Sequence, residues 1–140
     1  MMRMPGCQLE LSVRFGPTLD NLILGADLVA RLRKEAKIDV KTGDQIELAV
    51  GEALANAIKH GQADGDEAIG LTLVVENGML TVMVEDNGIG FSPEDVPPPN
   101  FDEHPSHGYG VFIINEIMDS ISYDSRDGIN KLTMKKRLEK

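Results

Sequence analysis

The sequence has a single cysteine, no long hydrophobic run and more acidic than basic residues. With only Cys7, an intrachain disulfide framework is excluded, which fits a reducing compartment. No apolar run approaches the roughly 20 residues that a membrane-spanning helix needs. The opening residues, MMRMPGCQ, also lack the apolar segment of a secretory signal. We therefore expect a cytoplasmic protein without a membrane segment.

Positive charge is scarce, with 14 Lys and Arg against 23 Asp and Glu and a formal net charge of −9. This balance argues against nucleic acid as a direct partner, because surfaces that bind its backbone are basic. A nucleotide remains compatible, since helix N-termini and a metal ion can hold phosphates without a basic patch. The phosphate-binding loop Gly-x4-Gly-Lys-Ser/Thr is absent, so any nucleotide must be held in another way.

Hydrophobic periodicity predicts the order strand, helix, helix, hairpin, long loop, helix, hairpin. The dipeptides Asn77-Gly78 and Asp127-Gly128 are strong hairpin signals. The expected strands are 8–15, 67–76, 79–85, 120–125 and 129–138, and the expected helices are 19–37, 43–60 and 109–119. Helices on one face of a mixed, mostly antiparallel sheet make a two-layer α+β sandwich.

The ends of these elements carry their own signals. Thr18 is placed to cap the first helix, and Gly61 to end the second. Residues 1–7 are expected to form a flexible N-terminus, where Cys7 is a poor candidate for a nucleophile. With no repeat and no linker, residues 8–140 are expected to form one domain.

Three short motifs point to chemistry. In ELAVGEALANAIKHG, Glu52 and Asn56 are four residues apart and share one helix face. In VEDNGIGF, Asp86 ends an apolar strand, and the glycines after it permit positive φ and close approach of a ligand. In SHGYGVFIIN, Gly108 and Gly110 precede a helix whose free N–H groups suit phosphate. Taken singly, the motifs are equally typical of a solvated helix face, a tight turn and an ordinary helix start.

In this order and on these elements, the three motifs resemble the N, G1 and G2 boxes of the Bergerat-fold (GHKL) ATPases, which include gyrase, heat-shock chaperones and histidine kinases. The chain length, Glu52 and the ending MDSISYDSRDGINKLTMKKRL are similar to the anti-sigma factor serine/threonine kinases. The resemblance implies the Bergerat type of α+β sandwich and one histidine kinase-like ATPase domain over residues 8–140.

The resemblance also assigns roles. Asn56 would bind the Mg²⁺ that bridges the phosphates of ATP, and Glu52 would be the general base that deprotonates a substrate hydroxyl, unless it only orients a water molecule or the metal shell. Asp86 would accept a hydrogen bond from the amino group of adenine.

Further positions line the same implied site. Gly88 and Gly90 would shape its floor, and Gly108 and Gly110 would offer backbone N–H groups to the phosphates. Thr133 matches a hydroxyl position near the adenine in related proteins, although a β-branched residue is also ordinary in a strand.

Residues 91–107 would be the lid over the nucleotide. No Lys or Arg lies between Asp86 and Gly110, whereas related lids often offer one to the terminal phosphate. Lys59, His104 and His107 are the available substitutes. The stretch DEHPSH, which contains both of these histidines, can alternatively be read as a zinc site with Asp102, or as a polar lid tip.

The implied function is a serine/threonine kinase that phosphorylates a STAS-type anti-anti-sigma protein and sequesters a sigma factor. The alternative from another class is a non-catalytic, ATP-gated binding module, which the missing lid cation favours. A detached histidine-kinase catalytic domain is disfavoured, because the chain has no dimerisation hairpin with a substrate His. The sequence leaves open whether the chain forms a homodimer.

Overall fold

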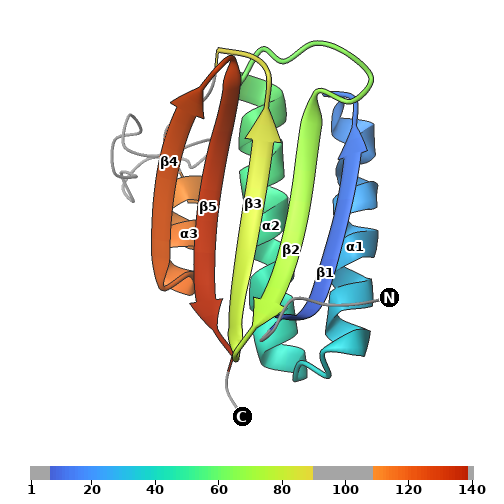
Figure 1. Cartoon of the computed structure of the whole chain (residues 1–140), viewed down its shortest axis with the longest axis vertical. Coiled ribbons are helices and arrows are strands. Elements are labelled where there is room, and N and C mark those ends of the chain that lie inside the picture. Colours follow the sequence, from blue (N-terminus) through green and yellow to red (C-terminus); the bar gives the residue numbers. More distant parts are fainter. Residues whose placement is uncertain (1–6, 90–108, 139–140) are drawn as a thin grey trace.

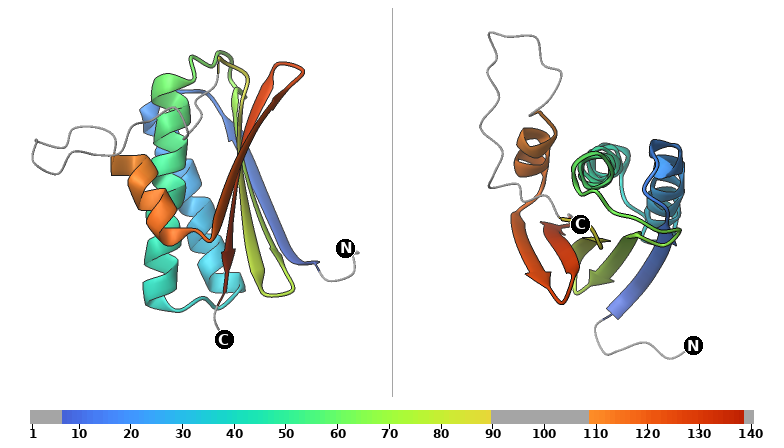
Figure 2. Two further views of the ribbon diagram at one scale, coloured as in Figure 1. Left: turned by 90° about the vertical axis from the view of Figure 1, so that its left-hand side faces the viewer. Right: turned by 90° about the horizontal axis from the view of Figure 1, so that it is seen from above.

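The protein is a two-layer sandwich with three helices on one face of a five-stranded sheet (Figures 1 and 2). The computed structural model describes residues 7–89 and 109–138. The predicted α+β class and two-layer arrangement are confirmed. The strands are β1 (Cys7–Phe15), β2 (Ile69–Glu76), β3 (Met79–Asp86), β4 (Ser120–Arg126) and β5 (Ile129–Arg137). The helices are η1 (Leu19–Asn21), a short 3-10 turn, and α1 (Leu22–Glu35), α2 (Val40–His60) and α3 (Tyr109–Ile117).

The sheet has the order β1-β2-β3-β5-β4, and every pairing between described strands is antiparallel. The expected mixed component is therefore not found in the described part of the chain. Both predicted hairpins are present, and their turn residues have positive φ: 53° and 78° at Asn77 and Gly78, 55° and 80° at Asp127 and Gly128. Such turns match the twist of the flanking strands, which is why these dipeptides predict hairpins well.

Side chains alternate between the two faces of the sheet. In β3, Leu80, Val82, Val84 and Asp86 are buried, while the intervening residues are half-buried. The buried set faces the helices, because it belongs to the core that the helices complete. The carboxylate of Asp86 is thus buried on the same face of β3 as three apolar side chains. It lies at the end of β3, next to the C-terminal end of α2.

The ends of two elements differ from the predictions. Cys7, expected in the flexible N-terminus, is the first residue of β1. Thr18 precedes η1 rather than an α-helix, and its side chain makes no capping hydrogen bond. Instead, the Asn21 side chain donates to the Gly16 carbonyl (2.9 Å), which ties the start of the helical segment to the end of β1.

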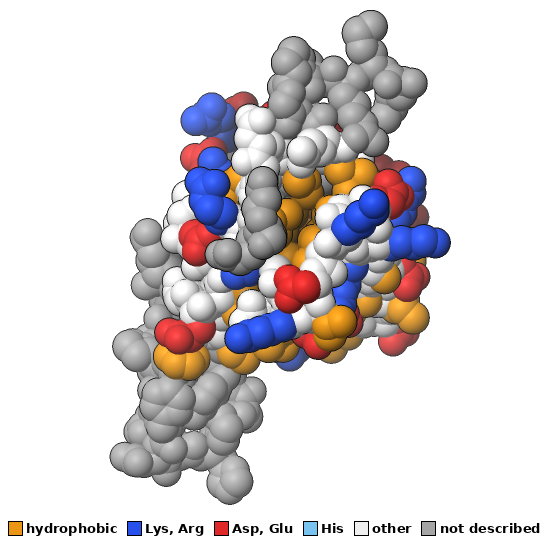
Figure 3. Space-filling view, turned by 90° about the horizontal axis from the view of Figure 1, so that it is seen from below, with side chains coloured by type: hydrophobic (Ala, Val, Ile, Leu, Met, Phe, Trp, Pro, Cys, Tyr) orange, Lys and Arg blue, Asp and Glu red, His pale blue; other side chains and the backbone are white. Residues whose placement is uncertain are grey.

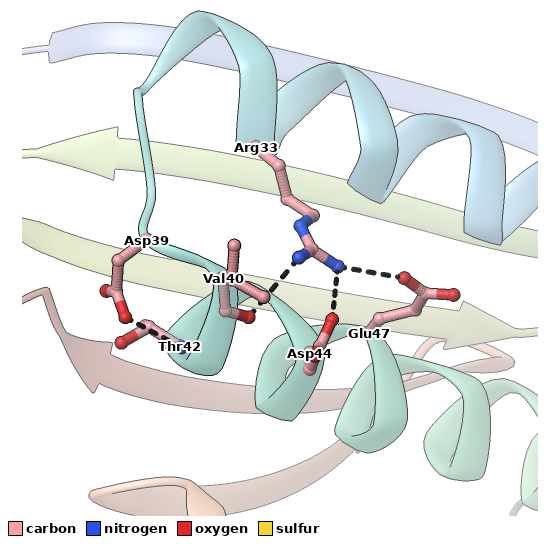
Figure 4. Close-up of polar contacts among 6 residues, drawn as sticks. All are labelled: Arg33, Asp39, Val40, Thr42, Asp44 and Glu47. Carbon is pink, nitrogen blue, oxygen red and sulfur yellow. Dashed lines mark hydrogen bonds and ion pairs between the residues drawn. The ribbon is translucent and has the colours of Figure 1, made fainter.

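The second helix begins three residues earlier than predicted, and Asp39 is its N-cap (Figure 4). The Thr42 N–H donates to Asp39 Oδ2 (3.2 Å), a standard way to satisfy a free N–H at a helix start. Hydrogen bonding from the Thr42 side chain, and then from the Thr42 backbone N–H, lowers the pKa of Asp39 below its ordinary value. The prediction missed this turn because it followed the apolar stripe, which starts at Ile46.

Helices α1 and α2 are joined on their outer side by Arg33. Its guanidinium lies 2.9 Å from Asp44 and 3.1 Å from Glu47, and it also donates to the Val40 carbonyl (3.3 Å; Figure 4). One cation therefore holds two carboxylates of the first turns of α2. On the opposite side of α2, buried residues such as Val50 pack against the sheet.

The end of the molecule seen from below carries interspersed acidic and basic side chains around a hollow with apolar atoms (Figure 3). This end is remote from Asp86, because β3 starts here and ends at the other side. Among the described helices, none is both long and apolar enough to cross a membrane.

Candidate functional site

A pocket lies between α2, α3 and the sheet; we call it the inner pocket. Three elements supply its polar and aromatic groups: Asn56 from α2, Asp86 from β3 and Tyr123 from β4. The remaining lining is apolar or small: Ala53, Ala57, Val84, Val111, Ile114 and Leu132. The described residues enclose a volume of only about 20 Å³ here, and the chemistry of the lining, a few convergent polar groups among apolar side chains, is that of a small-molecule site.

Asp86 is held rigidly at one side of this pocket, with 5% of its surface exposed. Its Oδ1 accepts from the Gly88 N–H (2.9 Å) and from Asn130 Nδ2 (2.9 Å). Within the described residues, both hydrogen bonds to the carboxylate go to Oδ1. Oδ2 therefore keeps its acceptor capacity for a donor on a ligand, such as an exocyclic amine.

Gly88 is required for a close backbone approach to the protein's own chain, whereas its approach to a ligand stays a prediction. A Cβ at Gly88 would collide with the Gly61 carbonyl oxygen and lie 2.6 Å from the Ala63 nitrogen. The prediction that Gly88 supplies positive φ is wrong, since its φ is not in that region. The Ile89 N–H also donates to the Gly61 carbonyl (2.6 Å), so this turn is clamped to the end of α2.

Glu52 and Asn56 meet the start of α3 at Gly110. A Cβ on Gly110 would lie 2.5 Å from Glu52 Oε1 and 3.5 Å from Asn56 Nδ2. Two polar side chains from one helix face thus converge on the first turn of another helix, where free N–H groups are available to an anion. The structure brings together Glu52, Asn56, Asp86, Gly88 and Gly110, although they are spread over 59 positions of the sequence.

Two predicted residues lie apart from this cluster. Lys59 is exposed, and it lies on the Asp86 side of Asn56, one turn farther from Glu52. Thr133 pairs with Met83 and faces away from the helices, because it alternates with the buried Leu132 and Met134. The expectation that Thr133 approaches a base in the inner pocket is therefore wrong: Leu132, its neighbour, lines the pocket instead.

The remaining predicted positions lie outside the described residues. They are Gly90, Gly108, the proposed lid 91–107 and the alternative metal ligands Asp102, His104 and His107. Within the described ranges, no group of three or more His, Cys, Asp or Glu side chains is arranged to hold a metal ion.

Sequence reasoning missed Asn130, which is 4% exposed and fixes the position of Asp86. Its Nδ2 donates to Asp86 Oδ1 and to the Gly88 carbonyl (2.8 Å), while its Oδ1 accepts from the Ser125 hydroxyl (2.5 Å). The signal was a polar residue on the apolar face of a strand, two positions after a hairpin turn. Only the register, which pairs Asn130 with Asp86, shows what it does.

Replacing Asn130 by Ala is expected to destabilise the fold by about 1–3 kcal/mol, because hydrogen-bonding groups would be left unpaired in a buried site. Nucleotide affinity should fall as well, since Asp86 would lose one of the two donors that orient it. Thermal unfolding and fluorescent-nucleotide titration measure both effects. Thr133→Ala, on the same strand but the opposite face, is the matched control; equal losses in the two variants would contradict this role.

Comparison with known proteins agrees with the geometry. Residues 16–136 match the family described as the histidine kinase-like ATPase domain. The chain belongs to this family. The predicted resemblance to the GHKL superfamily and to its anti-sigma factor kinases is confirmed, because relatives that this chain matches are named as an anti-sigma factor and as serine/threonine-protein kinases.

Two curated relatives span almost the whole chain. The anti-sigma F factor of Clostridium acetobutylicum is 29% identical over 133 residues, covering 91% of this chain and 93% of the relative. The serine/threonine-protein kinase BtrW of Bordetella bronchiseptica is 30% identical over 131 residues, covering 90% and 89%. The match to the serine-protein kinase RsbW of Bacillus thuringiensis is shorter, at 28% identity over 102 residues, 66% of this chain and 62% of the relative.

Solved structures of other histidine kinase-like ATPases share the fold. A crystal structure of the RsbU and RsbW domains of a Mycobacterium tuberculosis protein superposes with a TM-score of 0.72 at 17% identity, covering 95% of this chain and 33% of that one. A histidine kinase domain of Erythrobacter litoralis gives a TM-score of 0.53 at 22% identity, covering 86% and 60%. The Bergerat type of sandwich is thus shared with both.

The residues present fit a magnesium-bound nucleotide. The side-chain amide of Asn56 lies beside the first turn of α3, with Nδ2 near Gly110, and its oxygen is a hard ligand of the kind that Mg²⁺ accepts. Gly110 keeps that corner open, because any side chain there would press on Glu52. A bound Mg²⁺ would neutralise phosphate charge at this point, where described Lys and Arg side chains do not line the inner pocket.

Proposed function

We propose that this protein binds ATP with Mg²⁺ and transfers the terminal phosphate to a serine or threonine of a STAS-type anti-anti-sigma protein. By the name of one relative, the anti-sigma F factor, it would also bind a sigma factor and hold it inactive. The observation that carries this proposal is the convergence of Glu52 and Asn56 on Gly110, beside the inner pocket that Asn56 and Asp86 both line. A hydrogen-bond acceptor for the adenine, a metal ligand and a carboxylate that can take up a proton together suit phosphoryl transfer.

Within this site each residue has one task. Asp86 accepts the adenine amino group through Oδ2, and the apolar lining sandwiches the base. Asn56 supplies the protein ligand to Mg²⁺, and the N–H groups at the start of α3 face the phosphates. Glu52 takes the proton of the acceptor hydroxyl as its oxygen bonds to the γ-phosphorus, while the bond to the β-phosphate oxygen breaks and ADP leaves.

A second function is a non-catalytic module whose partner affinity depends on bound ATP. The observation that favours it is the lack of Lys or Arg between Asp86 and Gly110, together with the position of Lys59 on the far side of Asn56 from Glu52. Without a cation near the terminal phosphate, the transition state would lose charge stabilisation. Nucleotide binding needs no such cation.

The test is transfer of label from γ-labelled ATP to a STAS-domain protein of the same genome, with ATP affinity measured alongside. Asn56→Ala is expected to lose transfer, and to bind ATP in a way that no longer depends on Mg²⁺. Asn115→Ala is the control, since Asn115 is exposed on α3 and, among the described residues, its side chain donates to the Val111 carbonyl. ATP binding without transfer would favour the binding module, and failure of the wild type to bind ATP would refute both functions.

A further inference from the structure

A second, shallow pocket lies on the side of α2 that faces away from the sheet; we call it the outer pocket. Its apolar or small residues are Leu22, Leu48, Gly51 and Ala55. Its acidic residues are Asp44, Glu47 and Glu52. It is separate from the inner pocket, which opens on the other side of the same helix, and no residue lines both.

The α2 side of the outer pocket is open to solvent at Leu48 and Gly51. Leu48 is 47% exposed, and a Cβ built on Gly51 would meet no atom within 4 Å. Next to Leu22, the residues Leu19 and Ile23 are also exposed, at 48% and 63%. Apolar side chains gathered around a pocket on a surface are typical of a site that another chain covers.

The charge of the residues around the outer pocket limits the kind of ligand that it can bind. Asp44 and Glu47 share a single cation, Arg33, and Glu52 adds a third carboxylate. The side chains of Asp44 and Glu47 remain 67% and 51% exposed, whereas that of Arg33 is 22% exposed. An apolar pocket with surplus, accessible negative charge complements a segment that combines apolar side chains with Lys or Arg.

Glu52 connects this pocket to the proposed chemistry. Glu52 is one of the residues that line the outer pocket, and its carboxylate approaches Gly110 at the start of α3. Asn56, one turn further along α2, lines the inner pocket instead. Along α2, read from its C-terminal end, the inner pocket for adenine therefore comes first, followed by the metal ligand Asn56, the proton acceptor Glu52 and the outer pocket. A hydroxyl group held in the outer pocket would reach Glu52 from the side opposite the nucleotide.

We propose that the outer pocket binds the acceptor segment of the protein substrate: a segment that bears the reacting Ser or Thr, apolar side chains and at least one neighbouring Lys or Arg. This inference rests on the proposed kinase function and adds to it the chemistry of the acceptor. The apolar side chains would cover Leu48 and Gly51, and the basic side chain would pair with Asp44 and Glu47.

A matched pair of short peptides tests this proposal, each with one Ser and the same Leu residues, one carrying two Lys and the other two Glu. The wild type is expected to phosphorylate the Lys peptide with a kcat/KM about tenfold higher than that for the Glu peptide. A tenfold preference corresponds to the free energy of roughly two exposed ion pairs. The double variant Asp44→Asn, Glu47→Gln should reduce the preference to about twofold. ATP affinity should be unchanged, because neither residue touches the inner pocket.

Filling the outer pocket gives an independent measurement. Gly51→Leu is expected to lower kcat/KM for the Lys peptide about tenfold through a higher KM, with ATP affinity intact. Ala30→Leu is the control, since Ala30 is exposed on α1 and does not line the pocket. Equal use of both peptides, or a Gly51→Leu variant as active as the control, would overturn the outer pocket as the acceptor site. Transfer to a folded STAS protein in that case would leave the proposed kinase standing.

Discussion

The variant Glu52→Gln is expected to bind ATP normally and to transfer its phosphate about 100- to 10,000-fold more slowly than the wild type, the usual range for loss of a general base. Gln has the size of Glu and can still form hydrogen bonds, but it cannot take up the proton of the acceptor hydroxyl. Glu52 is half-buried, and its carboxylate is the group nearest to Gly110 at the start of α3. Single-turnover transfer and ATP titration measure the two quantities separately.

Two companion variants sharpen this prediction. Gly110→Ala would place a methyl group 2.5 Å from the present position of Glu52 Oε1, so the carboxylate must move, and transfer should fall without loss of stability. Glu35→Gln removes an exposed carboxylate on α1 that pairs with Arg31, and it should change nothing. If Glu52→Gln transfers phosphate within about threefold of the wild type, Glu52 is not the base, and a role in orienting water or the metal shell remains.

The second large effect is expected at Asp86. Asp86→Asn should weaken ATP binding about 100-fold. The amide N–H₂ group that replaces Oδ2 is a hydrogen-bond donor, and it would face the adenine amino group, which is also a donor. The fold should survive, since the amide oxygen can still accept from the Gly88 N–H and from Asn130. ITP carries an acceptor where ATP carries the amino group, and its affinity should therefore fall less.

Calorimetric titration with ATP and ITP, together with thermal unfolding, checks the Asp86 prediction. Asp64→Asn is the control: Asp64 is exposed in the neighbouring loop, and its backbone rather than its side chain bonds to Asn87. An Asp86→Asn variant that unfolds at the wild-type temperature and binds ATP as tightly as the wild type would show that the base is not read at Asp86.

The elements were predictable because their signals are local. Asn-Gly and Asp-Gly favour the backbone of a hairpin turn wherever they occur, and an apolar stripe at helical spacing marks the buried face of α2. The motif residues Glu52, Asn56, Asp86 and Gly110 were found by their spacing and order. The prediction that Thr133 lies near the adenine was wrong, because the sequence did not show which face of the sheet this strand residue occupies.

Residue spacing in the chain was thus enough to indicate the α+β class, the two hairpins and the residues that converge on the candidate site. Contacts between distant elements decided the rest. Asn130 supports Asp86 because the register of β3 and β5 sets the two side by side, and Gly88 must lack a side chain because the end of α2 passes directly beside it. The outer pocket likewise exists only where Leu22 of α1 lies across from Leu48 of α2. A linear sequence records periodicity and turn chemistry, whereas register and helix packing depend on which surfaces the folded chain brings together.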